Sequence, residues 1–139
     1  MGAIQIVLDT NVLVAALRSS KGASHHLLRL IDSGNFQLNI SVPLVLEYEA
    51  SAKRLTSLSS RDVDAVIDYI CAVSRPQKIH YLWRPILSDP QDDMVLELAV
   101  AGGCGVIVTY NKSDFAQAHG FGIQILTPKD FLKEIGGLP

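Results

Sequence analysis

Cysteine and aromatic residues are scarce in this sequence, and neither sign of charge is in large excess. Aromatic residues make up 6% of the 139 residues, and the only cysteines are Cys71 and Cys104. These two isolated thiols exclude a disulfide-rich scaffold and a cysteine-paired zinc site. Their apolar surroundings predict buried thiols in a protein of a reducing compartment. The net charge of -2 gives no overall attraction to nucleic acid, so any such binding needs a local basic patch or a metal ion.

Long hydrophobic runs are also missing. No apolar stretch approaches the roughly 20 residues of a membrane-spanning helix. The first apolar run, at residues 3–8, is interrupted by Asp9, which is too early for a secretory signal peptide. We therefore expect a cytoplasmic protein without a membrane segment. The content of 48% apolar and 19% charged residues is typical of a globular chain, and the length fits a single domain at 1–139.

Strand and helix patterns alternate along the chain. Strands are predicted at residues 3–8, 36–40, 78–82, 106–109 and 123–126. Helices are predicted at 11–18, 23–31, 42–55, 59–73, 89–101, 112–119 and from 127 onwards. This alternation predicts an α/β fold with a mostly parallel sheet and helices on both faces. The helical pair at about 42–73 has no strand between its members, so we expect an insertion there, forming a small arm or lid.

Two acidic residues stand out first. Asp9 comes where the first apolar run stops, and the carboxyl end of a central strand is where open α/β sheets bind ligands. The alternative is that Asp9 is only a helix N-cap. Glu47 lies inside an apolar helical segment, at 42–50, although most helical glutamates are simply solvated.

Two further groups of polar residues begin helices. Asp89, Asp92 and Asp93 fall within five residues; capping explains Asp89, but mutual repulsion opposes three acids so close together. Asn111 and Asp114 follow the fourth strand as Asp9 follows the first, with an Asx turn as the alternative. The ends of these two strands are neighbours at the switch point of a doubly wound sheet. Carboxylates gathered there would repel one another unless a cation held them, and hard oxygen ligands select Mg²⁺ or Mn²⁺.

Taken in order, these motifs resemble the PIN domain family, and in particular PIN-family toxins of bacterial toxin–antitoxin modules, related to the VapC ribonucleases. The resemblance runs over nearly the whole chain, through the segments 9–13, 41–49, 89–93 with 98–99, and 106–109. It implies a three-layer α/β/α fold around a five-stranded parallel sheet. It also implies an Mg²⁺- or Mn²⁺-dependent ribonuclease, often a homodimer and often held inactive by an antitoxin.

Carried over by position, the resemblance assigns the first three acids to Asp9, Glu47 and Asp92. Many family members have Asp where Asn111 stands, and the neutral amide removes one negative charge from the site. Asp114 supplies the missing carboxylate if residues 111–114 form a helical turn. The hypothesis is that Asp9, Glu47, Asp92 and Asp114 bind metal and act in catalysis, supported by Asn111, Thr109, Asp93 and Asn11.

The implied reaction is hydrolysis of an RNA phosphodiester by a metal-activated water. Local cations would attract the RNA backbone, the candidates being Arg18, Lys21, Lys53, Arg54 and Lys112. We expect the aromatic residues Tyr81, Trp83 and Tyr110 to pack rather than to stack on bases. The alternative function is a non-catalytic PIN-type RNA-binding module, in which Asn111 marks a degenerate site.

Overall fold

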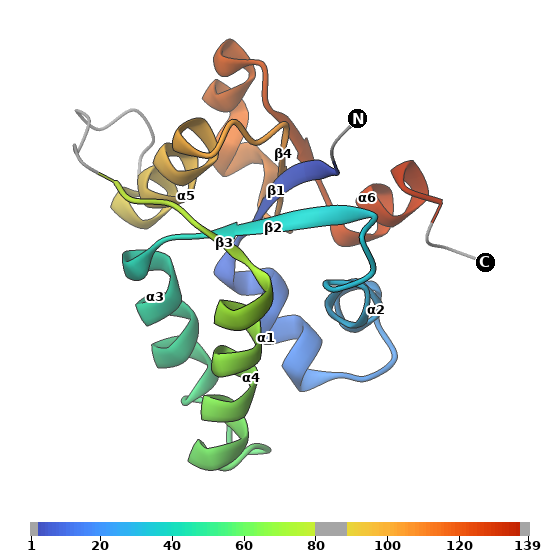
Figure 1. Ribbon diagram of the computed structural model, residues 1–139, viewed down its shortest axis with the longest axis vertical. Coiled ribbons are helices and arrows are strands. Elements are labelled where there is room, and N and C mark those ends of the chain that lie inside the picture. Colours follow the sequence, from blue (N-terminus) through green and yellow to red (C-terminus); the bar gives the residue numbers. More distant parts are fainter. Residues whose placement is uncertain (1–2, 80–88, 137–139) are drawn as a thin grey trace.

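A parallel five-stranded sheet forms the centre of the computed structural model, which describes residues 3–79 and 89–136 (Figure 1). The strands lie in the order β3-β2-β1-β4-β5, and each neighbouring pair is parallel. Their bounds are β1 Ile4–Leu8, β2 Phe36–Ile40, β3 Arg75–Pro76, β4 Val106–Val108 and β5 Gln124–Leu126. Central strands are buried on both faces, which explains the apolar runs of β4 and of the second half of β1, at residues 6–8.

Helices cover both faces of the sheet, so the predicted three-layer α/β/α fold is confirmed. In Figure 1 α5 lies on one side, whereas α1 to α4 and α6 lie on the other. Contacts agree: α5 packs on β1, β4 and η1, while α1 packs on α2 and α3, and α2 on α6. The bounds are α1 Thr10–Arg18, α2 Ala23–Arg29, α3 Val42–Ala52, α4 Ser60–Val73, α5 Pro90–Ala101, the 3₁₀ helix η1 Lys112–Phe121, and α6 Pro128–Glu134.

Helix starts follow the sequence closely because capping side chains determine them. Ser41, Ser59 and Thr127 each accept a backbone N–H with the side-chain oxygen, at the start of α3, α4 and α6. Helix ends were predicted less well: α2 ends two residues before the expected Ile31 and α3 three residues before Leu55. Among the described residues, no helix is long and apolar enough to span a bilayer.

The prediction of an edge strand at 78–82 is wrong for residues 78 and 79, which the structure describes outside any strand. The strand lies earlier, at Arg75–Pro76, and residues 80–82 fall outside the described part of the chain. A proline is tolerated there because an edge strand needs no donor on its outer side. The prediction for Cys71 is also wrong, since this residue is exposed and lines a surface pocket together with Val42 and Val45 of α3. Cys104 is buried as expected.

A buried amide anchors the short strand β3. Asn39 of β2 is fully buried, and its Nδ2 donates to Gln5 Oε1 at 2.9 Å. The Oδ1 of Asn39 accepts from Gln77 Nε2 at 3.0 Å. Arg75 Nη1 donates to the same Gln5 oxygen at 3.1 Å and to the carbonyl of Gly102 at 3.4 Å. This network ties β1, β2, β3 and the end of α5 together.

Candidate functional site

The candidate site lies where the strand order of the sheet reverses. β1 pairs with β2 on one side and with β4 on the other, and Leu8 is in register with Val108. Asp9 and Thr109 are the next residues of these two strands, and Asp9 N donates to Val108 O at 2.9 Å. The two side chains therefore emerge together at the switch point, where open α/β sheets bind ligands.

Asp9 caps α1 and is also anchored across the sheet. Its Oδ1 accepts the backbone N–H of Thr10 at 2.8 Å. Its Oδ2 accepts the hydroxyl of Thr109 at 2.8 Å and the amide of Asn11 at 3.3 Å. The side chain is only 9% exposed. The cap and the candidate site residue are thus the same residue, held in one orientation by donors from two elements.

Asn11 links the start of α1 to the loop after β4. Its Nδ2 donates to Thr109 Oγ1 at 3.4 Å, and its Oδ1 accepts the backbone N–H of Tyr110 at 3.3 Å. The hydroxyl oxygen of Thr109 also accepts the N–H of Asn111 at 3.0 Å. The loop at 109–111 is therefore held against Asp9 by side chains as well as by the sheet.

Carboxylates from three other positions act electrostatically on Asp9 or Asp92. Burial raises the pKa of Asp9, hydrogen bonds from Thr109 and Thr10 lower it, and the charges of Asp114 and Asp89 raise it further. Burial, followed by the charges of Asp9, Asp89, Asp114 and Asp93, raises the pKa of Asp92 to about 6. The start of α5 and the start of η1 therefore lie close to the end of β1.

Asp114 is brought to this edge by a helical turn, as the sequence analysis requires. Its backbone N–H donates to the carbonyl of Asn111 at 3.1 Å, and Asn111 occupies the N-cap position of η1. The helix is 3₁₀ and runs to Phe121, whereas an ordinary helix ending at His119 was expected. The side chain of Asn111 makes no capping hydrogen bond.

Glu47 lies on α3, one residue before the tyrosine that fastens this helix to the sheet. It is half-buried on α3, and Ser51 Oγ donates to its Oε1 at 3.2 Å. The next residue, Tyr48, fastens α3 to the sheet by donating its hydroxyl to Leu8 O at 2.6 Å. Burial and then the charge of Asp9 raise the pKa of Tyr48, so α3 passes near Asp9. The role of Glu47 stays a prediction.

Two buried acids follow Asp92 along α5. Asp93 is 8% exposed and Glu97 7% exposed. Glu97 was not recognised from the sequence, although it stands one turn after Asp93 and on the same face of the helix. The only sequence signal for Glu97 is its spacing of four residues from Asp93 within a largely apolar helix.

The donor set at this edge suits a hard divalent cation, because it consists of carboxylate and amide oxygens. As the side chains stand, no three histidine, cysteine, aspartate or glutamate residues within 3–79 and 89–136 are grouped closely enough to hold a metal ion. Asp92 is half-buried in the first turn of α5, and the charge of Asp9 acts on it. These residues therefore carry the types of donor atom that such an ion prefers.

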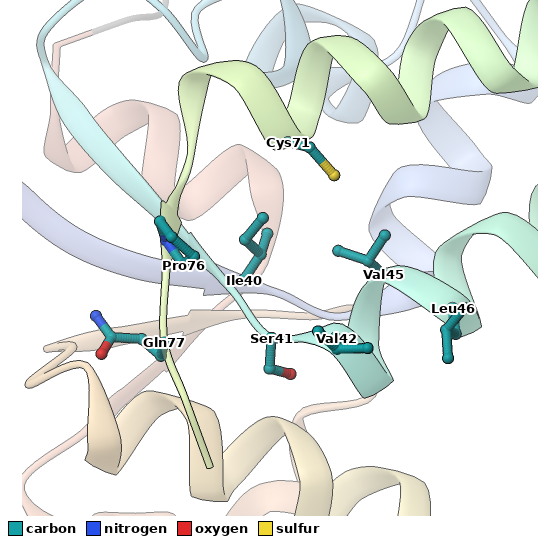
Figure 2. A pocket seen from close by; sticks show the side chains of 8 residues that line it. All are labelled: Ile40, Ser41, Val42, Val45, Leu46, Cys71, Pro76 and Gln77. Atoms are coloured by element: carbon teal, nitrogen blue, oxygen red, sulfur yellow. The ribbon is translucent and has the colours of Figure 1, made fainter.

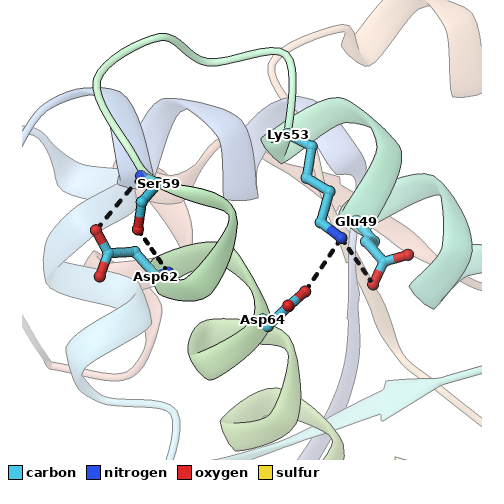
Figure 3. Close-up of polar contacts among 5 residues, drawn as sticks. All are labelled: Glu49, Lys53, Ser59, Asp62 and Asp64. Carbon is cyan, nitrogen blue, oxygen red and sulfur yellow. Dashed lines mark hydrogen bonds and ion pairs between the residues drawn. The ribbon is translucent and has the colours of Figure 1, made fainter.

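Two of the five predicted RNA-contacting cations are far from these acids or already paired. Arg18 is at the far end of the nine-residue helix that Asp9 caps, about 13 Å along its axis. Lys53 Nζ lies 3.1 Å from Asp64 and 3.7 Å from Glu49, joining α3 to α4 (Figure 3). Lys112 is adjacent to Asn111 and exposed, so it lies beside the candidate site.

An apolar groove opens beside the start of α3. Figure 2 shows Val42, Val45 and Leu46 of α3 on one side, with Cys71 of α4 and Pro76 of β3 around them. Val42 is 73% exposed and Leu46 59% exposed, so the groove continues onto an open apolar surface. Its lining is separate from the acids at the end of β1.

Comparisons with known proteins agree with this architecture. A family model described as PIN domain matches residues 5–113. The structure is similar to VapBC2 from Rickettsia felis bound to a DNA fragment from the promoter, with a TM-score of 0.64 and 14% identity, covering 89% of this chain and 98% of that one. It is also similar to VapBC-1 from nontypeable Haemophilus influenzae, with a TM-score of 0.62 and 17% identity, covering 91% and 99%. A comparison with curated proteins gives no match.

Proposed function

Because this chain belongs to the PIN domain family, we propose that it is an Mg²⁺- or Mn²⁺-dependent ribonuclease that hydrolyses RNA phosphodiester bonds. The proposal is supported by the charges of Asp9, Asp92 and Asp114, which act on one another near the end of β1, although their side chains as they stand are not grouped closely enough to hold an ion. These residues come from three different elements of the chain. Helix capping explains only one of the three, Asp9 at the start of α1.

In this proposal Asp9 and Asp92 bind the ion and Asp114 completes the set, with Glu47 binding it or orienting a water. A bound ion would supply an activated water and neutralise charge on the phosphate. Asp9 Oδ2 already accepts two hydrogen bonds and Oδ1 only one, so Oδ1 keeps a lone pair to offer. Thr109 and Asn11 fix that carboxylate in place, and Asn111 offers a neutral oxygen beside it.

The test is cleavage of labelled single-stranded RNA with Mg²⁺ or Mn²⁺ and with chelator. We expect cleavage that needs the metal and is lost in Asp9→Asn and Glu47→Gln, while the charge-matched control Asp68→Asn, on the exposed face of α4, retains it. Cleavage that persists in both site variants would come from a contaminant and would contradict the proposal.

The alternative is a PIN-type module that binds RNA without cutting it. It is favoured by the neutral Asn111 and by the absence of a ready-grouped set of three acids among the described residues. RNA binding that is independent of metal, with no cleavage at any metal concentration, would support this alternative and exclude the nuclease.

We further propose that the protein is the cytoplasmic toxin of a toxin–antitoxin module, acting as a homodimer and inhibited by an antitoxin. The support is the similarity of its fold to the two VapBC structures. Induced expression in a bacterial host should arrest growth, and Asp9→Asn should abolish the arrest at equal protein level. Equal arrest by both forms would contradict a toxic nuclease.

A further inference from the structure

Tyr110 occupies an unusual position beside the candidate site. It stands between Thr109, whose hydroxyl bonds Asp9, and Asn111, which occupies the N-cap position of η1. The sequence predicts that Tyr110 packs against the protein, but the residue is 46% exposed. An aromatic residue so exposed, next to acids proposed to cut RNA, requires an explanation.

Both polar groups of Tyr110 are bonded to the protein. Its backbone N–H donates to Asn11 Oδ1 at 3.3 Å. Its hydroxyl shares a hydrogen bond with Ser24 Oγ of α2, and Ser24 is only 2% exposed. The residue is therefore held at its backbone by α1 and at its far end by α2.

A surface tyrosine usually packs part of its ring and leaves the hydroxyl in water. Tyr110 instead bonds its hydroxyl to a buried serine, while the residue as a whole is 46% exposed. A ring already held in one orientation loses little conformational entropy when a flat ligand packs against it.

Other exposed aromatic residues in the described part of the chain lack this setting. Tyr69 is 43% exposed on α4, and Phe121 is 46% exposed at the end of η1. Tyr110 differs from Tyr69 and Phe121 because its own backbone bonds a residue that contacts Asp9. Unpaired RNA bases are commonly bound by stacking on such rings.

We propose that the ring of Tyr110 stacks on an unpaired base of the RNA, flanking the phosphate that lies at the acids. The inference rests on the proposed ribonuclease function and names the substrate as single-stranded RNA at that position. Tyr110 is a substrate-binding residue in this scheme, and Ser24 positions its ring.

The test separates substrate binding from catalysis. Tyr110→Ala should raise KM for single-stranded RNA about ten-fold with little change in kcat, while Tyr110→Phe keeps the ring and stays within about three-fold of wild type. Tyr69→Ala is the matched control and should match wild type. A fall in kcat with unchanged KM would assign Tyr110 to positioning Asn111 and would overturn stacking.

A second measurement does not depend on cleavage. RNA with 2-aminopurine placed in turn at each position is bound to the Asp9→Asn variant. We expect quenching at one position, which is lost on adding Tyr110→Ala. If quenching is found at no position, the inference is overturned even when the wild type cleaves RNA. A wild type that binds RNA but never cuts it, with quenching still dependent on Tyr110, would overturn the ribonuclease and leave the stacking inference standing.

Discussion

Thr109 donates its hydroxyl hydrogen bond to Asp9 across 100 residues of sequence, at 2.8 Å between Oγ1 and Oδ2. The same oxygen of Thr109 accepts from the Asn111 N–H and from Asn11. Thr109 is fully buried. A single hydroxyl thus fixes the candidate metal ligand at the end of β1 and the loop that follows β4.

Replacing Thr109 by valine removes that hydroxyl while keeping the shape of the side chain. Asp9 then loses a donor and the Asn111 N–H loses its acceptor, so we expect a loss of about 1–3 kcal/mol in the free energy of unfolding. Urea unfolding with chelator measures this loss, and Mn²⁺ titration should show weaker binding. Thr109→Ser keeps the hydroxyl and should recover most of both properties. Equal behaviour of the serine and valine variants would mean that the hydroxyl contributes nothing.

Asp92→Asn should stabilise the metal-free protein at neutral pH. The folded state raises the pKa of Asp92 from 3.8 to about 6. The folded state therefore binds more protons than the unfolded state in this range, and stability falls as the pH rises from about 4 to about 6. Because Asp92 is partly exposed, solvent screening reduces the gain to about 1 kcal/mol, which is about 3 °C in Tm.

Thermal unfolding in chelator across pH 4–8 checks this prediction. The wild type should lose stability through that window more steeply than Asp92→Asn, and the two should converge at low pH. If added Mn²⁺ raised the Tm of both proteins equally, Asp92 would not be a ligand.

Gly102→Ala should destabilise the fold through Asn39. A Cβ at this position would lie 2.9 Å from Asn39 Oδ1 and 3.1 Å from Cys104 Sγ. Asn39 cannot move aside because it is fully buried and bonded to Gln5, so we expect a loss of about 1–3 kcal/mol. Gly105 has nothing within 4 Å of such a Cβ, and Gly105→Ala is the control, expected to be neutral or slightly stabilising. Denaturant unfolding compares the two, and an equal loss for both would contradict the clash.

The layout of the fold could be predicted because apolar runs and caps are local signals. β1, β2 and α5 were found from such patterns, and the pairing of β1 with β4 followed from the doubly wound topology. β3 was misplaced because two residues carry no apolar period. It exists through the buried amide of Asn39 and the bonds of Arg75, which are tertiary contacts.

The candidate site could be predicted only in part, for a related reason. Asp9 and Asp114 are marked by their places after strands, and the structure brings both to one edge. The hydroxyl of Tyr110 bonds Ser24, 86 residues away, and no local pattern in the sequence contains that contact. Glu97 was missed because its burial depends on how α5 packs.

Lys112 and Lys53 offer a charge-matched pair that tests where RNA lies. Lys112 is exposed beside Asn111 at the start of η1, whereas Lys53 is engaged by Asp64 and Glu49. A phosphate at the acids is therefore expected to meet Lys112 and not Lys53. Lys112→Gln should weaken RNA binding several-fold and reduce the slope of log K against log salt by about 1, while Lys53→Gln should leave both unchanged. Anisotropy titrations at several salt concentrations, using the Asp9→Asn background, measure both. A larger effect from Lys53→Gln would place the RNA on the α3–α4 surface, away from the end of β1.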